Sequence, residues 1–139
     1  MGDSDDRVIE IAKVRLFEKT EAQLEGFFEE IGNISKKKPD DAINKFKLGF
    51  VNQMLETANT LLDEEYRPFP DFDKFDIDTP PTASDVVTML SQYLRSMDTF
   101  RKDHTSMSGG WYYWNLPNDS EHKEDSDRIR AKRPKNFSN

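Results

Sequence analysis

The sequence contains no cysteine. Disulfide bonds, thiolate nucleophiles and metal sites with cysteine ligands are therefore excluded. No apolar run approaches the roughly 18 residues that a membrane span requires. Residues 2–6 are polar and acidic, unlike a secretory signal. We therefore expect a cytoplasmic protein that does not insert into a membrane.

Recognisable catalytic and metal-binding patterns are also missing. The chain has no Glu-x-x-His motif, and its two histidines, His104 and His122, stand in no triad pattern. Arg101 and His104 lie one helical turn apart, which suits a ribonuclease pair. Electrostatics favours another interpretation, two cations at the negative end of a helix dipole. We assign no catalytic residue, no metal ligand and no cofactor.

Charge is unevenly distributed along the 139 residues. The chain carries −7, but residues 128–135 hold five cations and no acid, so residues 1–127 carry −12. An acidic body favours basic partners. The five cations could contact phosphates or the acids of a protein, and we expect them to lie on an acidic surface of the same chain, another copy or a partner. They are Arg128, Arg130, Lys132, Arg133 and Lys135.

Apolar residues recur at helical spacing in three segments, which predicts an all-α fold, a small bundle of three main helices. The first helix is expected over residues 6–31, with Ser4 to Asp6 as capping candidates and Gly32 as its end. The second is expected over 40–64, opening after Pro39, and the third from residues 82–84 to about 104. The predicted inward stripe of the first helix is Ile9, Ala12, Leu16, Thr20, Leu24, Phe27 and Ile31, widened by Val8, Phe17 and Phe28. That of the second is Ile43, Phe46, Phe50, Met54, Ala58 and Leu61, widened by Val51, Leu55 and Leu62. That of the third is Val86, Leu90, Tyr93, Met97 and Phe100, with Val87 and Leu94 beside it.

Two glycines stand in the middle of the first two predicted helices. If these helices form a hairpin, Gly26 and Gly49 come level with each other. Glycine costs about 1 kcal/mol relative to alanine inside a helix, so a reason for it is expected. We predict that the two backbones cross closely at these positions.

The segment from Tyr66 to Pro81 contains four prolines, which forbid a regular helix. It is too apolar for a free linker. We predict a Pro-rich ordered loop in which at least three of its apolar residues are mostly buried: Tyr66, Phe69, Phe72, Phe75 and Ile77. Its acids should face water, where they are candidate partner contacts: Asp71, Asp73, Asp76 and Asp78. They lack the ligand order of a calcium-binding EF-hand loop.

Two glycines, Gly109 and Gly110, precede four consecutive aromatic residues, Trp111, Tyr112, Tyr113 and Trp114. The glycines can turn the chain back across the bundle. In an extended segment neighbouring side chains alternate, so two of the four rings can cover the core. The outward pair is a candidate partner contact, because exposed Trp and Tyr are common at binding hot spots. We expect a bundle domain with this aromatic C-terminal arm over residues 1–117 and a polar tail over 118–139.

These observations favour a non-enzymatic, acidic protein-binding module. It would be a subunit of an assembly, or an inhibitor or immunity-type protein that masks a basic partner; a homo-oligomer stays open. One alternative is a helical enzyme, a metal-dependent hydrolase or a ribonuclease. Another is a nucleic-acid adaptor that acts through residues 128–135.

Overall fold

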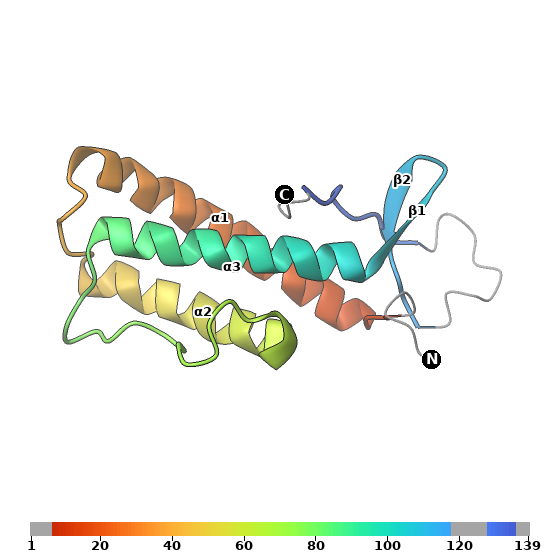
Figure 1. The fold of residues 1–139 in the computed structure, drawn as a ribbon, viewed down its shortest axis with the longest axis horizontal. Coiled ribbons are helices and arrows are strands. Elements are labelled where there is room, and N and C mark those ends of the chain that lie inside the picture. Colours follow the sequence, from red (N-terminus) through yellow and green to blue (C-terminus); the bar gives the residue numbers. More distant parts are fainter. Residues whose placement is uncertain (1–6, 118–127, 136–139) are drawn as a thin grey trace.

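The computed structural model describes residues 7–117 and 128–135. It contains three helices, α1 (Ile11–Lys37), α2 (Lys45–Tyr66) and α3 (Ala83–Asp103), followed by the strands β1 (Thr105–Ser108) and β2 (Trp111–Trp114). The predicted small helical bundle is confirmed, with a short β-hairpin at its end (Figure 1). The expected capping residues Ser4 to Asp6, His122 and the outer parts of the predicted tail lie outside the described residues.

The long loop between α2 and α3 allows these two helices to run in the same direction (Figure 1). α1 lies antiparallel to both α2 and α3, and the loop over residues 67–82 returns along α2 to begin α3 (Figure 1). Consequently α2 and α3 are parallel neighbours. Within the described part of the chain, none of the helices has the length and hydrophobicity that a bilayer span needs.

The bounds and the inward face of α1 differ from the prediction. Residues 7–10 precede the helix, with Glu10 extended, and the amide of Ile9 donates to the carbonyl of Asn115 at 2.8 Å. The helix continues through Gly32 to Lys37, because Ile31 is buried and Ile34 packs on the core beyond it. Leu16, expected inside, is 44% exposed. The buried residues of α1 are Val14, Phe17, Thr20, Glu21, Leu24 and Ile31.

α2 departs from the predicted stripe near its N-terminal end. It begins after Asn44, whose side chain accepts from the amide of Lys47 at 2.8 Å. Phe46 and Phe50, expected in the core, are 79% and 40% exposed and pack edge-to-face against each other. The rest of the prediction holds, because Ile43, Ala58 and Leu61 of the stripe are buried, and so are the residues expected to widen it, Val51, Leu55 and Leu62. The buried residues of α2 are Leu48, Val51, Asn52, Leu55, Ala58, Leu61 and Leu62.

The predicted glycine crossing is also wrong. A Cβ built on Gly26 or Gly49 would meet no atom within 4 Å. Neither position therefore needs the absence of a side chain for helix packing.

α3 follows the prediction closely. Thr82 precedes it and its side chain accepts from the amide of Asp85 at 3.2 Å. The predicted stripe is buried from Val86 to Phe100. This helix forms the central wall against which α1, α2 and the hairpin pack.

The Pro-rich loop is fixed by side chains of α2. The amide group of Asn52 donates to the carbonyl of Phe75 and accepts from its N–H, both at 2.9 Å. Asn59 donates to the carbonyl of Asp73 at 3.0 Å. Tyr66, Phe72 and Phe75 are partly buried against the core, whereas Phe69 and Ile77 are 40% and 39% exposed.

Candidate functional site

The β-hairpin turns at the two glycines. Gly109 and Gly110 have φ values of 59° and 88°, which suit glycine. The turn pairs β1 with β2 in register from Thr105 opposite Trp114 to Ser108 opposite Trp111. The expected turn is therefore present, and it places the four aromatic residues on one strand.

The last of these aromatics covers the end of the bundle. Trp114 is 1% exposed, and its ring meets Phe17 edge-to-face with ring centres 5.3 Å apart. Its indole N–H donates to Glu18 at 3.1 Å. Trp114 is therefore a core residue. Its assignment as a candidate partner contact is wrong, because its side chain is buried.

The outward aromatics are covered by the chain's own cations. Trp111 is 53% exposed, while Tyr112 and Tyr113 are partly buried. The guanidinium carbon of Arg130 lies 3.7 Å from the centre of the Trp111 ring. That of Arg128 lies 5.0 Å from the centre of the Tyr113 ring. Both distances are within the range of cation–π attraction.

Backbone hydrogen bonds extend the hairpin by a third, antiparallel segment. Trp114 donates to the carbonyl of Ile129 at 3.0 Å, and Ala131 donates to that of Tyr112 at 2.9 Å. Tyr113 and Arg130 stand opposite each other. Ile129 and Ala131 pack toward the core. Cations and apolar residues thus alternate between the two faces, as in a strand.

The same segment continues onto the helices. The ammonium of Lys132 lies 3.3 Å from Glu25 and 3.7 Å from Glu21. The backbone N–H of Lys135 donates to the Asp98 carboxylate, at 2.9 Å from Oδ2. We call residues 128–135 the basic segment. We call the surface beneath it the seat, formed chiefly by Trp111, Tyr113, Glu21, Glu25 and Asp98.

A buried ionic cluster lies under the basic segment. Arg101 is 3% exposed and donates to Asp98 at 2.8 Å and to Glu21. Arg101 lies in the last turn of α3, as expected, but it also pairs there with two buried carboxylates, which was not expected. Sequence reasoning missed Glu21 and Asp98. For Glu21 a signal was available: this acid lies next to Thr20 and three residues before Leu24, both of which face the core, so its side chain could be expected to be buried.

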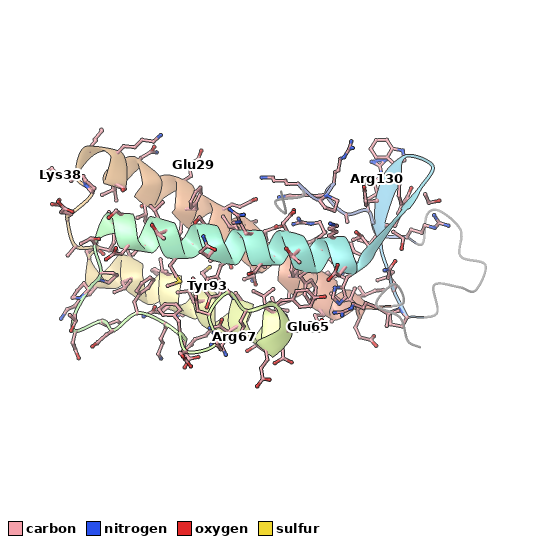
Figure 2. The ribbon with its side chains drawn as sticks, viewed as in Figure 1. Glu29, Lys38, Glu65, Arg67, Tyr93 and Arg130 are labelled. Atoms are coloured by element: carbon pink, nitrogen blue, oxygen red, sulfur yellow. The ribbon has the colours of Figure 1, made fainter. Side chains whose placement is uncertain are left out.

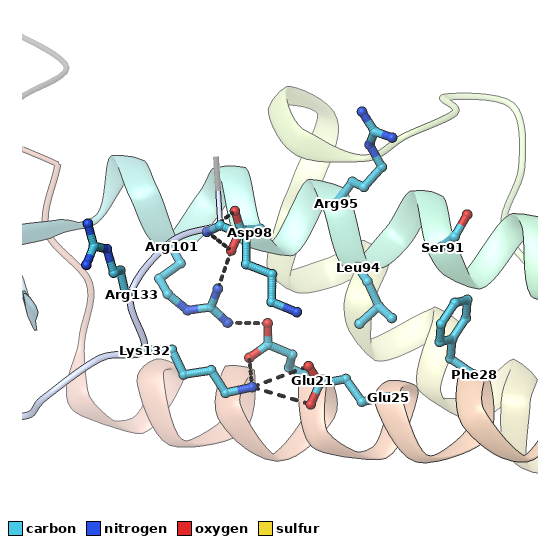
Figure 3. Close-up of a pocket in the computed structure, with 11 residues that line it drawn as sticks. Glu21, Glu25, Phe28, Ser91, Leu94, Arg95, Asp98, Arg101, Lys132 and Arg133 are labelled. Atoms are coloured by element: carbon cyan, nitrogen blue, oxygen red, sulfur yellow. Dashed lines mark hydrogen bonds and ion pairs between the residues drawn. The ribbon is translucent and has the colours of Figure 1, made fainter. Parts of the chain in front are cut away.

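A cavity of about 330 Å³ adjoins this cluster, between α1, α3 and residues 132–135. Phe28 and Leu94 project toward its apolar end (Figure 3). Glu21, Asp98 and Arg101 are joined by hydrogen bonds and ion pairs at its other end (Figure 3). The cavity is therefore amphipathic.

His104 is not a cation paired with Arg101. Its ring stacks on Phe100, with ring centres 3.9 Å apart, and Nδ1 lies 2.8 Å from the Phe100 carbonyl oxygen. Burial lowers the pKa of His104 below its ordinary value of 6.5, which favours a neutral ring. Because Arg101 is directed to Glu21, the two residues do not form the ribonuclease pair considered above.

The acidic loop is a separate surface. Asp71, Asp73, Asp76 and Asp78 are exposed along the α2 side of the bundle, away from the basic segment (Figure 1). Asp73 pairs with Arg67 at 2.8 Å, and Asp76 accepts from the amide of Asp78 at 2.9 Å. Across residues 7–117 and 128–135, no group of three or more His, Asp or Glu residues could hold a metal ion.

The structure therefore unites two predicted features, the aromatic block and the basic segment, and leaves the third, the acidic loop, apart. Arg128, Arg130 and Lys132 contact the seat through their side chains, and Lys135 contacts it through its backbone N–H. Arg133 and Lys135 are also among the residues that line the adjoining cavity. The chain matches no protein-family model, and neither the curated proteins nor the solved structures contain a significant match to it.

Proposed function

We propose that the protein is a non-enzymatic, acidic binding module that holds an extended basic segment of a partner protein. The observation that supports this function most directly is the way in which its own basic segment is seated. Arginine side chains lie over two aromatic rings, a lysine pairs with two glutamates, and main-chain hydrogen bonds extend the hairpin. A partner chain with the same chemistry can make the same contacts, because strand addition relies on backbone groups that every sequence offers.

The contacts define the chemistry of the partner. Arg128 and Arg130 are two residues apart and cover Tyr113 and Trp111, and Lys132 follows two residues later. The residues between them face the core and are Ile129 and Ala131. The partner segment is therefore an extended Arg-x-Arg-x-Lys stretch whose intervening residues are apolar or small.

The charge of the protein supports the same class of partner. Residues 1–127 carry −12. Such a field raises the rate at which a basic protein meets the surface and is weakened by salt. The exposed acids of the Pro-rich loop contribute to this attraction from the α2 side, since the loop runs along α2, away from the basic segment (Figure 1). A cytoplasmic assembly subunit or an inhibitor of a basic protein would use the surface in this way.

The protein's own basic segment competes with a partner for the seat. A segment tethered by a short linker has an effective concentration in the millimolar range. The apparent dissociation constant of a partner equals its intrinsic value divided by the fraction of time during which the seat is open. If the segment occupies the seat for about nine-tenths of the time, a partner binds about tenfold more weakly than to an open seat.

The experiment uses the full chain and a labelled peptide with the sequence of residues 128–135. An open variant, with Arg128→Ser, Arg130→Ser and Lys132→Ser, leaves the seat intact but weakens its own segment. We expect saturable binding of the peptide to the open variant by fluorescence anisotropy. Binding to the native chain should be about tenfold weaker.

Two controls separate seating from simple charge attraction. The variant with Lys36→Ser, Lys37→Ser and Lys38→Ser removes the same three charges at the far end of α1; Figure 2 places Lys38 and Arg130 at opposite ends of the molecule. It should bind the peptide like the native chain. A peptide of the same composition with its cations grouped together should bind the open variant several-fold more weakly. Equal affinity of both peptides for all three proteins would contradict the proposed function.

A further inference from the structure

The cavity beside the seat lies at the end of the path that the basic segment follows. The backbone N–H of Lys135 donates to the Asp98 carboxylate. Asp98 lines the cavity, and so does Leu94, one helical turn earlier on α3. Figure 1 shows the basic segment leaving the hairpin and running back along the helices. A partner segment that takes this path and continues beyond it therefore passes from Asp98 toward Leu94.

The cavity is apolar at the end that such a segment would reach. The side chains of Phe28 of α1 and Leu94 of α3 project toward it, and both are partly buried against the core (Figure 3). Because they belong to different helices, the packing of the bundle fixes the space between them. The cavity measures about 330 Å³, which exceeds the ~150 Å³ of an engineered cavity that binds benzene. It therefore has room for one aromatic side chain.

The charged groups at the other end of the cavity already have partners. Arg101 pairs with Glu21 and Asp98, and Lys132 pairs with Glu21 and Glu25. These side chains hold one another and the basic segment. The apolar end is thus the part of the cavity where a further side chain gains most, because its burial there removes apolar surface from water.

A second hollow continues the cavity past Phe28. It is lined by Phe28 and Val87, by Gly32 of α1, and by the acids Glu25 and Glu29. Since Glu25 and Phe28 line both spaces, the two form one groove between α1 and α3. A partner chain consequently has a path beyond the cavity as well as into it.

We propose that the cavity takes an aromatic side chain of the partner segment, two residues after the position that Lys135 occupies in the protein's own segment. This inference rests on the proposed function, which seats a partner along the same path. Leu94 lies about 6 Å along α3 from Asp98, and two residues of extended chain span about 7 Å. The protein's own sequence has the same spacing, since Phe137 stands two residues after Lys135. The partner motif is therefore Arg-x-Arg-x-Lys followed, after four further residues, by an aromatic residue.

The aromatic anchor and the cations respond differently to salt. Salt screens ion pairs at exposed positions, such as that of Lys132 with Glu25. Burial of a ring against Phe28 and Leu94 is not screened in this way. The anchor should therefore keep its effect on affinity at a salt concentration that weakens the rest of the seat.

The test uses two labelled peptides, one with the sequence of residues 128–139 and one in which the phenylalanine at position 137 is serine. The receptor is the full-length open variant with Phe137→Ser, which removes the chain's own copy of the proposed anchor. By fluorescence anisotropy we expect the serine peptide to bind about tenfold more weakly. This ratio should persist between about 0.05 and 0.5 M salt, while both affinities fall. In NMR spectra the amides of Ser91 and Leu94 should shift with the phenylalanine peptide and not with the serine peptide.

Receptor variants locate the anchor. Leu94→Ala should weaken binding of the phenylalanine peptide several-fold and leave that of the serine peptide unchanged. Leu16→Ala is the matched control, because it shortens a half-exposed leucine outside the lining of the cavity. Ser91→Trp fills the edge of the cavity without removing a core side chain, and should reduce the difference between the peptides to less than about twofold. Thr99→Trp adds the same ring beside Tyr66 instead and should preserve the difference. Circular dichroism checks that each variant is folded.

The outcomes separate this inference from the proposed function. It is supported by a preference for the phenylalanine peptide that Leu94→Ala and Ser91→Trp reduce. Saturable binding of both peptides with equal affinity overturns the anchor and leaves the proposed function standing. A preference that survives both receptor variants overturns the location. If neither peptide binds saturably, the proposed function fails, and the anchor fails with it.

Discussion

The guanidinium of Arg130 lies over the indole ring of Trp111, 3.7 Å from its centre. A cation–π contact at an exposed site contributes about 0.5–1 kcal/mol. Arg130→Ser should therefore raise the opening rate of the basic segment, and the Ala131 amide should exchange about two to five times faster. Hydrogen–deuterium exchange followed by NMR measures this directly.

The matched control is Arg133→Ser, which removes the same charge from another exposed position of the segment. It should change the exchange of Ala131 less than Arg130→Ser does. Arg130→Lys should fall between the two, because an ammonium lacks the planar face that stacks on indole. If both serine variants accelerate exchange equally, the contact with Trp111 contributes only charge.

The two mid-helix glycines offer a stabilising change. A Cβ on Gly26 or Gly49 meets no atom within 4 Å, so alanine introduces no clash. Each Gly→Ala substitution should raise the free energy of unfolding by about 0.5–1 kcal/mol, as measured by urea denaturation. Gly110→Ala is the opposite control, since a φ of 88° strains any side chain. Destabilisation by Gly26→Ala or Gly49→Ala would show that the helices do approach closely there.

Local signals in the sequence predicted the parts of the fold that local physics decides. α3 has a hydroxyl cap at Thr82 and a single apolar stripe, and both were found as expected. The Gly109–Gly110 turn was recognisable because few other residues adopt those φ values. In α2, however, Phe46 and Val51 belong to two stripes with the same helical period. Only packing against α1 and α3 selects the stripe that contains Val51, and that packing is not visible in one sequence.

The seat was predictable in its parts and not in its assembly. The aromatic block and the basic segment were each conspicuous in composition, and an acidic surface was expected to hold the cations. Their pairing brings Lys132 to Glu25, which is 107 residues away along the chain. Glu21 and Arg101 are similarly distant, 80 residues apart. Long-range polar contacts of this kind follow from the packing of α1 on α3, which periodicity alone does not place.

The buried ionic cluster should be costly to break from one side. Arg101→Met leaves the buried carboxylates of Glu21 and Asp98 with one cationic neighbour fewer, and removing one member of a buried pair costs about 3–5 kcal/mol. The expected result is a fall of this size in the free energy of unfolding in urea. Lys102→Met, at the adjacent exposed position, should change it by less than about 0.5 kcal/mol. Equal effects of the two substitutions would contradict a structural role for the cluster.

His104 should make stability depend on pH in a defined direction. Burial lowers its pKa, the hydrogen bond to the Phe100 carbonyl raises it, and nearby Arg7 lowers it further. The net effect is that the pKa of His104 in the folded chain lies below 6.5. The unfolded chain therefore takes up a proton at a higher pH than the folded chain does. The stabilisation is complete above pH 6.5 and is lost as the pH falls through the pKa of the folded state.

Urea denaturation at about pH 7.5, 6.5 and 5.5 measures this contribution. Because carboxylates also begin to titrate at the acidic end, the informative quantity is the difference between the native chain and His104→Gln. That difference should shrink as the pH falls, since glutamine cannot take up the proton. The NMR titration of the His104 ring should have its midpoint below 6.5. Parallel stability curves for the two proteins, or a midpoint above 6.5, would mean that water reaches a ring that the structure places against Phe100 and Tyr66.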